Sequence, residues 1–455
     1  MPKRITDILE HLGFITLGVM SILFAEERLL ADSSYYFIRV INWESFWIEH
    51  SRLILMLPEL APLIGSLLKL ELKSLVYLYS IGHVVFFYLM YLICRYRYKN
   101  KIAGLVILLF QILGIRQGFF VPMFELYYAT GLLILLFSIL NCERITISSY
   151  IVITALAVFI ASAHMFAIVL LVFLLFWQAL DTNNKPWKAY AAILTCVSGF
   201  SIYKRSHISE YEQGKMDGFI DGLRNYSPDL IYLQNLGSFL TTHYLELLVL
   251  ATISFSLLLW QKRYWRLLTY TMSFTVLLIM VTIAYRGFDS SRYQEQVYFP
   301  VSFVVAWVFV ESSNSVPNKR IKTALLVIGL GVFVIRTIGI NEEAKWFTSR
   351  QNELRSLISL TQEKAGTKFF IHESLLNHDP NWSYSIESMI LSSIEYDKTV
   401  TICTNIDIEH GSNLTSLEPN QFLFRRWELY NQSVLNPTYF RLDNSDYQRL
   451  QKPID

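Results

Sequence analysis

The sequence is poor in charge and lacks the short fingerprints that mark common soluble enzymes. Charged side chains make up 17% of the 455 residues, whereas soluble domains average about 25%. The chain contains no GxGxxG after a strand-like segment, no Walker A sequence, no HExxH and no GxSxG. Dinucleotide-fold, P-loop, zinc-protease and serine-hydrolase chemistry are therefore not indicated.

Cysteine is equally uninformative. The four cysteines, Cys94, Cys142, Cys196 and Cys403, do not have the spacing of metal ligands, and the first three lie in or beside hydrophobic runs. We expect all four to be free thiols. No small-residue cleavage motif follows the first hydrophobic run, so we expect that run to remain as a membrane anchor.

The sequence is instead rich in long apolar blocks. Hydrophobic residues make up 53% of the chain and occur in repeated runs, which is typical of an all-α polytopic membrane protein. We predict about eleven transmembrane helices. The predicted spans are 12–30, 74–93, 102–115, 126–140, two within 150–180, then 189–202, 236–259, 267–284, 297–310 and 323–340.

Three compact basic clusters predict the orientation of these spans. They are RYRYKNK at 95–101, QKRYWR at 261–266 and NKRIK at 318–322. Basic residues beside spans favour the cytoplasm, and the eleven-span topology places all three clusters and the N-terminus there. The topology requires two short spans in the apolar block 150–180, with a turn at Ala161-Ser162-Ala163-His164. One tilted helix is the alternative, and it would move the last two clusters outside.

The segment 26–73 between the first two spans is long, aromatic and acidic. We expect it to lie along the outer membrane surface, with its apolar faces in the headgroup region and its carboxylates facing a cavity. Its last part, 53–68, contains Pro58, Glu59 and Pro62, which favour a broken interfacial helix over a span.

Composition changes again near residue 341. We predict a transmembrane domain at 1–340 and a small extracytoplasmic α/β domain at 341–455, in a multi-pass protein of the cell inner (plasma) membrane. Strands are expected at 368–371 and 399–403, and helices at 349–362 and 383–394.

Ionisable residues gather on the predicted outer face, where their cost near a membrane favours a functional role. The candidate catalytic residues are Asp32, Glu26, Glu27 and Glu49. The candidate substrate-binding residues are His50, Arg52, Arg116, Glu125, His164, Arg286 and Arg292.

Each candidate also has a structural interpretation. Asp32 can cap a helix as well as act as a general base. Glu49 with Arg52, and Arg116 with Glu125, can simply form ion pairs. His164 can be a polar group packed at a helix turn. Arg286 and Arg292 can be interfacial anchors, and a guanidinium also matches phosphate geometry.

These features resemble the GT-C class of integral membrane glycosyltransferases. The matching pieces are Ala31-Asp32-Ser33-Ser34-Tyr35-Tyr36, the segment running to Leu70, and the late arginines of Arg286-Gly-Phe-Asp-Ser-Ser-Arg292. The resemblance implies that a sugar moves from a polyprenyl-phosphate carrier to a saccharide, lipid or protein acceptor outside the cytoplasm. It further implies an essential carboxylate in the first outer loop, for which Asp32 is the match, and arginines on the lipid phosphate. No nucleic acid is implied.

The chain departs from the class at one point. The second outer loop contains no Asp-x-Asp or Glu-x-Asp pair, and Glu125 is the only acid near it, so a divalent metal cofactor stays open. Two alternative functions are a polysaccharide polymerase or ligase and a transporter or lipid flippase. A transporter predicts inverted repeats and charges within spans, whereas here no repeat is found and the charges gather at one face.

Overall fold

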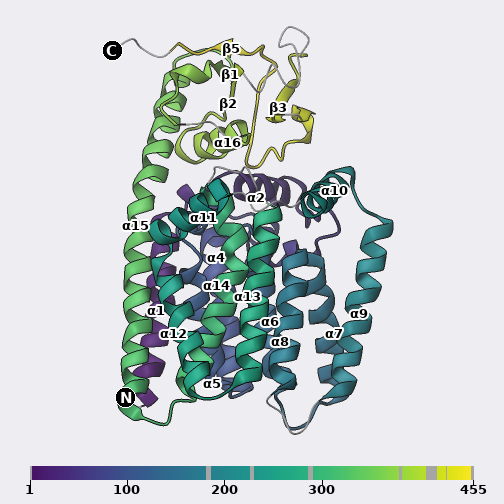
Figure 1. The fold of residues 1–455 in the computed structure, drawn as a ribbon. Helices are drawn as coiled ribbons and strands as arrows, with labels where there is room; N and C mark the ends of the chain where they lie inside the picture. The colour runs from purple at the N-terminus through teal and green to yellow at the C-terminus, as the bar shows by residue number, and fades with distance from the viewer. Residues whose placement is uncertain are drawn as a thin grey trace.

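The chain folds into a bundle of long helices with a small mixed domain at one end (Figure 1). The computed structural model describes residues 3–180, 186–225, 230–284, 291–378, 382–405, 418–426 and 428–451. The helices are α1 Lys3–Leu23, α2 Asp32–Trp43, α3 Met56–Leu67, α4 Leu72–Leu92, α5 Lys101–Leu113, α6 Glu125–Leu140, α7 Ile147–Ala163, α8 Met165–Ala179, α9 Trp187–Ser206, α10 Glu210–Arg224, α11 Leu230–His243, α12 Leu245–Trp260, α13 Tyr264–Ala284, α14 Ser291–Asn314, α15 Lys319–Gln362 and α16 Tyr384–Glu395. The strands are β1 Lys368–Ile371, β2 Thr401–Thr404, β3 Gln421–Arg425, β4 Glu428–Asn431 and β5 Gln448–Arg449.

A helix occupies the place of each predicted span, but only some of these helices have the length of a full crossing. Among the described residues, five are long and apolar enough to cross a bilayer, namely α1, α4, α13, α14 and α15. The bent pair α11 and α12 makes a sixth if it counts as one span. Helices α5 to α8 have 13 to 17 residues, fewer than the ~20 of an ordinary span. The structure thus supports a helical membrane protein and leaves eleven crossings as a prediction.

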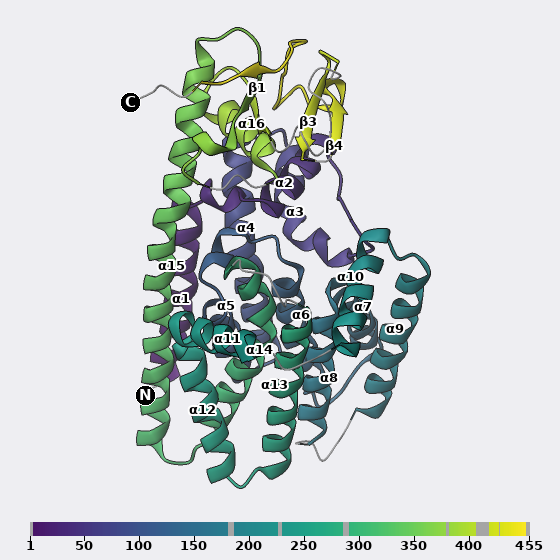
Figure 2. The same ribbon diagram turned by 45° about the horizontal axis from the view of Figure 1, so that its top comes forward.

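The predicted break at His164 is confirmed. Helix α7 ends at Ala163 and α8 begins at Met165, with His164 between them in an extended conformation. The His164 ring accepts a hydrogen bond from the Phe166 backbone NH at 3.3 Å, which caps the start of α8. The two helices lie side by side in both views (Figures 1 and 2).

Two predicted spans have the wrong bounds. The first span is predicted at 12–30, but α1 ends at Leu23 and a 3₁₀ turn follows at Glu27–Leu29. The predicted span 236–259 is bent by 98° where α11 meets α12 at Tyr244. The bend leaves helix-end carbonyls that need donors. The buried guanidinium of Arg336 supplies one, donating to the His243 carbonyl at 2.6 Å. It also donates to the carbonyls of Ile112 and Ile115 at the end of α5, at 3.1 and 3.0 Å.

The segment 26–73, which is predicted to lie outside and is called the first outer segment below, is more regular than expected. It forms α2 and α3, and α2 lies between the bundle and the C-terminal domain (Figures 1 and 2). The prediction of a broken helix at 53–68 is wrong, because α3 is continuous with Pro62 inside it. Pro62 removes only the bond to the carbonyl of residue 58. One side of α3 exposes Leu60, Ile64 and Leu67.

The C-terminal domain contains two small sheets. In the first, β1 is central and pairs in parallel with β2 and β5; in the second, β3 and β4 are antiparallel. The predicted strands at 368–371 and 399–403 and the helix at 383–394 are confirmed within a residue or two. The separate helix predicted at 349–362 is instead the end of α15. At 44 residues, α15 is about 66 Å long, and it connects the bundle to the domain without a break at residue 341 (Figure 1).

Arg39 of α2 joins the first outer segment to this domain. Its side chain is buried and forms an ion pair with Glu428 of β4 at 2.7 Å. The guanidinium also lies within 5.0 Å of five ring centroids, three from the first outer segment and two from the domain. These rings belong to Tyr35, Trp43, Trp47, Phe424 and Tyr430. Arginine is suited to this role because it stacks on aromatic faces and keeps its charge.

The orientation can be tested with single cysteines at two exposed positions. We expect Lys99→Cys to react with an impermeant thiol reagent only after the membrane is opened, and Glu363→Cys to react in intact cells. The reason is that Lys99 lies in the densest basic cluster, whereas Glu363 follows the end of α15. Labelling of both positions from the same side would contradict the topology, and the parental protein measures labelling of the native thiols.

Candidate functional site

Ionisable residues from four separate segments meet at the end of the bundle that faces the C-terminal domain. We name Asp32, Glu49, Arg52, Glu125 and Glu212, together with Tyr36, the outer acidic cluster. Helices α2, α6 and α10 and the 43–55 connection carry these residues. Helices α2 and α10 lie at the end of the bundle that faces the C-terminal domain (Figure 1).

Arg52 is the cation at the centre of the cluster. Its Nη1 donates to Glu125 Oε1, and its Nε and Nη2 donate to Glu212 Oε1 at 3.2 and 3.1 Å. The arginine side chain is 14% exposed. His50 and Ser51 immediately before it have φ values of 53° and 57°, and this left-handed turn directs Arg52 back towards the bundle. The predicted Arg52–Glu49 pair is therefore wrong: Arg52 binds acids that are distant in sequence.

Glu49 is held by aromatic donors instead. The Tyr35 and Tyr36 hydroxyls donate to it at 2.5 and 3.2 Å, and the Trp47 ring NH donates at 3.1 Å. Burial raises the pKa of Glu49, but the hydrogen bonds from Tyr35 and Trp47, together with the charges of Arg425 and His50, leave it below its usual value. Glu49 is thus a charged acceptor that orients the two tyrosines.

Tyr36 of α2 is buried among several carboxylates. Burial, followed by the negative charges of Glu49, Glu125 and Asp32, raises the pKa of the Tyr36 phenol well above its usual value. Asp32 begins α2 and Glu125 begins α6, far apart in the sequence. The phenol therefore stays neutral and remains a hydrogen-bond donor to Glu49.

Asp32 follows a residue with an unusual backbone. Ala31 has φ 53° and ψ −117°, a conformation that costs a residue with a Cβ on the order of 1–3 kcal/mol. The Ala31 NH donates to Glu387 Oε1 of α16 at 3.2 Å. Glu387 is itself buried and paired with Arg350 of α15 at 2.5 Å. The C-terminal domain thus holds the start of α2, and with it Asp32.

His50 and His164 border the cluster. The His50 ring shares a hydrogen bond with Ser209 Oγ at 2.8 Å and stacks on Tyr211, with ring centroids 5.0 Å apart. Burial and the nearby Arg52 lower the pKa of both imidazoles. Both rings therefore favour the neutral form, in which they can accept or donate a hydrogen bond.

Three candidates have partners in α15 instead of in the cluster. Glu26 forms an ion pair with Arg355 of α15, and Glu27 accepts a hydrogen bond from Thr348 at 2.9 Å. Arg116 pairs with Glu343 at 2.7 Å. The predicted Arg116–Glu125 pair is therefore wrong, since each binds a different partner. These three residues attach α15 to the loops of the bundle.

Two candidates lie outside what the structure describes. Arg286 falls outside the described residues, and Arg292 lies in the first turn of α14, where the side chains are not described.

Sequence analysis missed Glu212 of the cluster and its neighbour Lys204. Glu212 and Lys204 form an ion pair at 3.2 Å beside Arg52, and burial lowers the pKa of Lys204. Both come from the polar connection 203–235, for which no role is predicted from the sequence. The sequence feature that could have indicated them is the run of charged residues at 204–217, on the same predicted face as Glu49 and Arg52.

The donor set does not fit a divalent metal ion. Glu125 and Glu212 share the guanidinium of Arg52, which occupies the position between carboxylates that a cation requires. Within the described ranges, no group of three or more histidine, cysteine, aspartate or glutamate side chains is arranged to hold a metal.

Comparisons with known protein families, with curated proteins and with solved structures found no match to this chain. The function is therefore inferred from the site itself.

The neutral state of His50 predicts a pH dependence of stability. Its pKa is lower in the folded protein than in the unfolded chain, so the stabilisation is complete above about 6.5 and is lost as pH falls through the folded value. The groups around the ring are Glu49, Arg52, Lys204 and Glu212.

We expect the melting temperature of the parent protein in detergent to fall more between pH 7.5 and 5.5 than that of His50→Asn. Asparagine tolerates the positive φ at this position, so the fold is retained. Identical pH profiles for the two proteins would show that His50 does not titrate in this range.

Proposed function

We propose that the protein is a membrane glycosyltransferase that moves a sugar from a polyprenyl-phosphate carrier to an acceptor at the outer membrane face. The observation that carries the proposal is the contact between the first outer segment and the start of α6: Arg52 pairs with Glu125, and Tyr36 of α2 donates to Glu49, three residues before Arg52. Asp32 belongs to the first outer segment, the part of the chain in which the resemblance to GT-C enzymes implies the essential carboxylate. The cluster also lies at the end of a helical bundle, where a lipid-linked donor can reach it from the bilayer.

Asp32 is the proposed general base. Its carboxylate takes the proton of an acceptor hydroxyl, and the resulting oxygen nucleophile attacks the anomeric carbon of the donor sugar. The bond between that carbon and the phosphate oxygen breaks, and its electron pair leaves with the polyprenyl phosphate. Glu49 is less suitable, because the three hydrogen bonds that it accepts stabilise its charged form and weaken it as a base.

Arg292, with Arg286, is the proposed partner of the departing phosphate, because a guanidinium matches phosphate geometry with two parallel hydrogen bonds. Arg52 has a different role, because it pairs with both Glu125 and Glu212 and so joins α6 to α10. We further propose that the chain crosses the membrane eleven times, with the short helices α5 to α8 in a locally thinned bilayer.

Replacing Asp32 tests the chemical step. General-base catalysis contributes roughly 10²- to 10⁴-fold, so Asp32→Asn should lower turnover by at least about 10²-fold. The measurement is release of polyprenyl phosphate from a panel of synthetic polyprenyl-phosphate hexoses and pentoses, followed by mass spectrometry. Asparagine serves the start of a helix nearly as well as aspartate, so folding should be retained.

Glu27→Gln is the matched control for Asp32→Asn, because glutamine still accepts the hydrogen bond of Thr348. We expect it to keep near-parental turnover. Parental turnover in well-folded Asp32→Asn would remove Asp32 from the chemistry. No donor turnover by the parent protein across the panel, with acceptor-containing membranes present, would count against the transferase itself.

The role of Arg292 is tested by its charge-conserving replacement. Arg292→Lys keeps the charge and loses the bidentate geometry, so donor KM should rise, whereas Arg320→Lys in the predicted inner cluster should leave KM unchanged. Equal donor KM for Arg292→Ala and the parent would exclude this assignment.

A further inference from the structure

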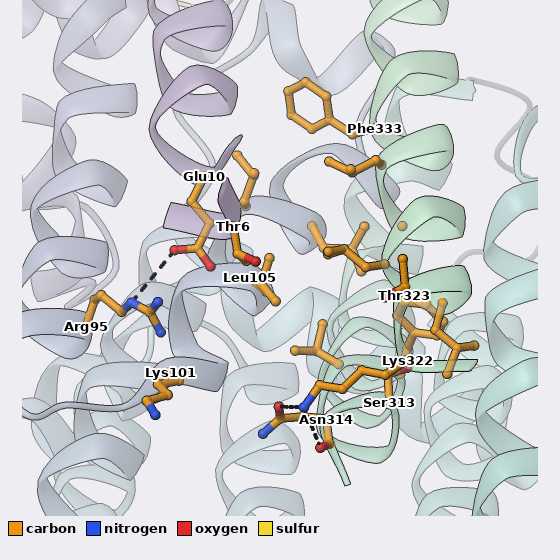
Figure 3. Close-up of a pocket in the computed structure, with 18 of the residues that line it drawn as sticks. Thr6, Glu10, Arg95, Lys101, Leu105, Ser313, Asn314, Lys322, Thr323 and Phe333 are labelled. Atoms are coloured by element: carbon orange, nitrogen blue, oxygen red, sulfur yellow. Dashed lines mark hydrogen bonds and ion pairs between the residues drawn. The ribbon is translucent and has the colours of Figure 1, made fainter. Parts of the chain in front are cut away.

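A second site lies at the opposite end of the bundle, far from the outer acidic cluster. It is a cavity of about 420 Å³ between α1, α5, α14 and α15, together with the turn that carries Arg95 (Figure 3). This volume is within the range of small-molecule sites. On the orientation that the basic clusters predict, the cavity opens towards the inner leaflet.

One part of the cavity is apolar. Leucines of α5 and α15 and phenylalanines of α14 and α15 form this wall, among them Leu105, Leu108, Phe309, Leu330 and Phe333. Gly329 of α15 also lines it, and a Cβ at this position would meet only Phe309, at an ordinary contact distance of 3.5 Å. The absence of a side chain at Gly329 leaves space along the wall for an alkyl chain.

The other part of the cavity is basic. The charged lining residues are four cations, Arg95, Lys101, Lys319 and Lys322, and one carboxylate, Glu10. Figure 3 shows Glu10 facing Arg95, with Lys101 below Arg95 on the same side and Lys322 across from them beside Asn314. Arg95 forms ion pairs with two acids of α1: its Nε lies 3.9 Å from Glu10, and its Nη2 contacts Asp7.

The three lysines are not neutralised by acids. Within the described part of the chain, Lys101, Lys319 and Lys322 form no ion pair, and Lys322 donates only to the amide and backbone oxygens of Asn314. Lys101 and Asn314 also line a second cavity of about 370 Å³. Its polar lining includes Trp307, whose buried ring NH has no hydrogen-bond partner among the described residues. Lysine and indole NH groups are donors suited to an anion.

We infer that these two cavities, which share Lys101 and Asn314, together bind an anionic phospholipid of the inner leaflet. One acyl chain lies along the apolar wall between α5 and α15, the phosphate lies at Lys101, Lys319 and Lys322, and the rest of the headgroup extends into the polar cavity at Trp307. Charge complementarity selects an anionic headgroup over a zwitterionic one. The apolar wall selects a lipid over a free phosphate. The site is independent of the proposed transferase chemistry.

The test uses the full chain in nanodiscs of phosphatidylcholine and phosphatidylglycerol, with retained lipid counted by native mass spectrometry. We expect the parent to retain phosphatidylglycerol in preference to phosphatidylcholine. The triple variant Lys101→Gln, Lys319→Gln, Lys322→Gln should bind it about 10²-fold more weakly. The matched control is a triple replacement by glutamine of exposed basic residues outside the cavity, Arg144, Lys188 and Lys262.

A second pair of variants tests the acyl chain without changing charge. Gly329→Leu fills the apolar wall, and we expect it to reduce retention of phosphatidylglycerol at least about tenfold relative to Gly331→Leu, which adds the same side chain where no atom lies within 4 Å. This pair keeps the proposal testable if the lysine triple variant does not fold.

Three outcomes would overturn the proposal. One is equal retention of phosphatidylglycerol by the lysine triple variant and the parent. Another is equal retention by Gly329→Leu and Gly331→Leu. The third is displacement of phosphatidylglycerol from the parent by millimolar inorganic phosphate, which would identify a site for a free anion instead.

Discussion

The buried ion pair between Arg350 and Glu387 connects the three parts of this protein. Arg350 comes from the long helix α15, Glu387 from α16 of the C-terminal domain, and the Ala31 NH from the first outer segment donates to the same carboxylate. Both charged side chains are at most 2% exposed. Removing one partner of such a pair typically costs about 3–5 kcal/mol, because the other charge remains buried. The strained backbone at Ala31, and hence the position of Asp32, depends on this contact.

Ion pairs also offset the charge of the outer acidic cluster. Several carboxylates in a partly buried space repel one another. The guanidinium of Arg52 within the cluster and the ammonium of Lys204 beside it offset this repulsion. Aromatic hydroxyl groups neutralise none of the charge but satisfy Glu49. The proposed base, Asp32, stands at the start of α2 beside these compensated acids. The basic cavity at the other end has the opposite balance, with lysines that form no ion pair within the described residues beside an apolar wall.

Regular features were predictable from the sequence because local physics determines them. Long apolar runs became helices, the polar interruption at His164 became a break, and the short apolar runs at 368–371 and 399–403 became strands. Boundaries were less predictable: α1 ends seven residues before the predicted end of the first span, and α15 continues through residue 341. Helix ends depend on which groups cap them, and the cap of α11 is Arg336, from a helix distant in sequence.

The sequence by itself determined that the chain is a helical membrane protein with charged residues gathered in its long connections. Apolar composition and charge distribution are sums over neighbouring residues, and no tertiary contact is needed to evaluate them. Only the tertiary structure decided which acid meets which base. Glu49 and Arg52 are three residues apart but bind different partners, whereas Arg52 and Glu212 are 160 residues apart and bind each other. Long side chains reach any acid that the helix packing brings near, and that packing depends on contacts spread over the whole chain.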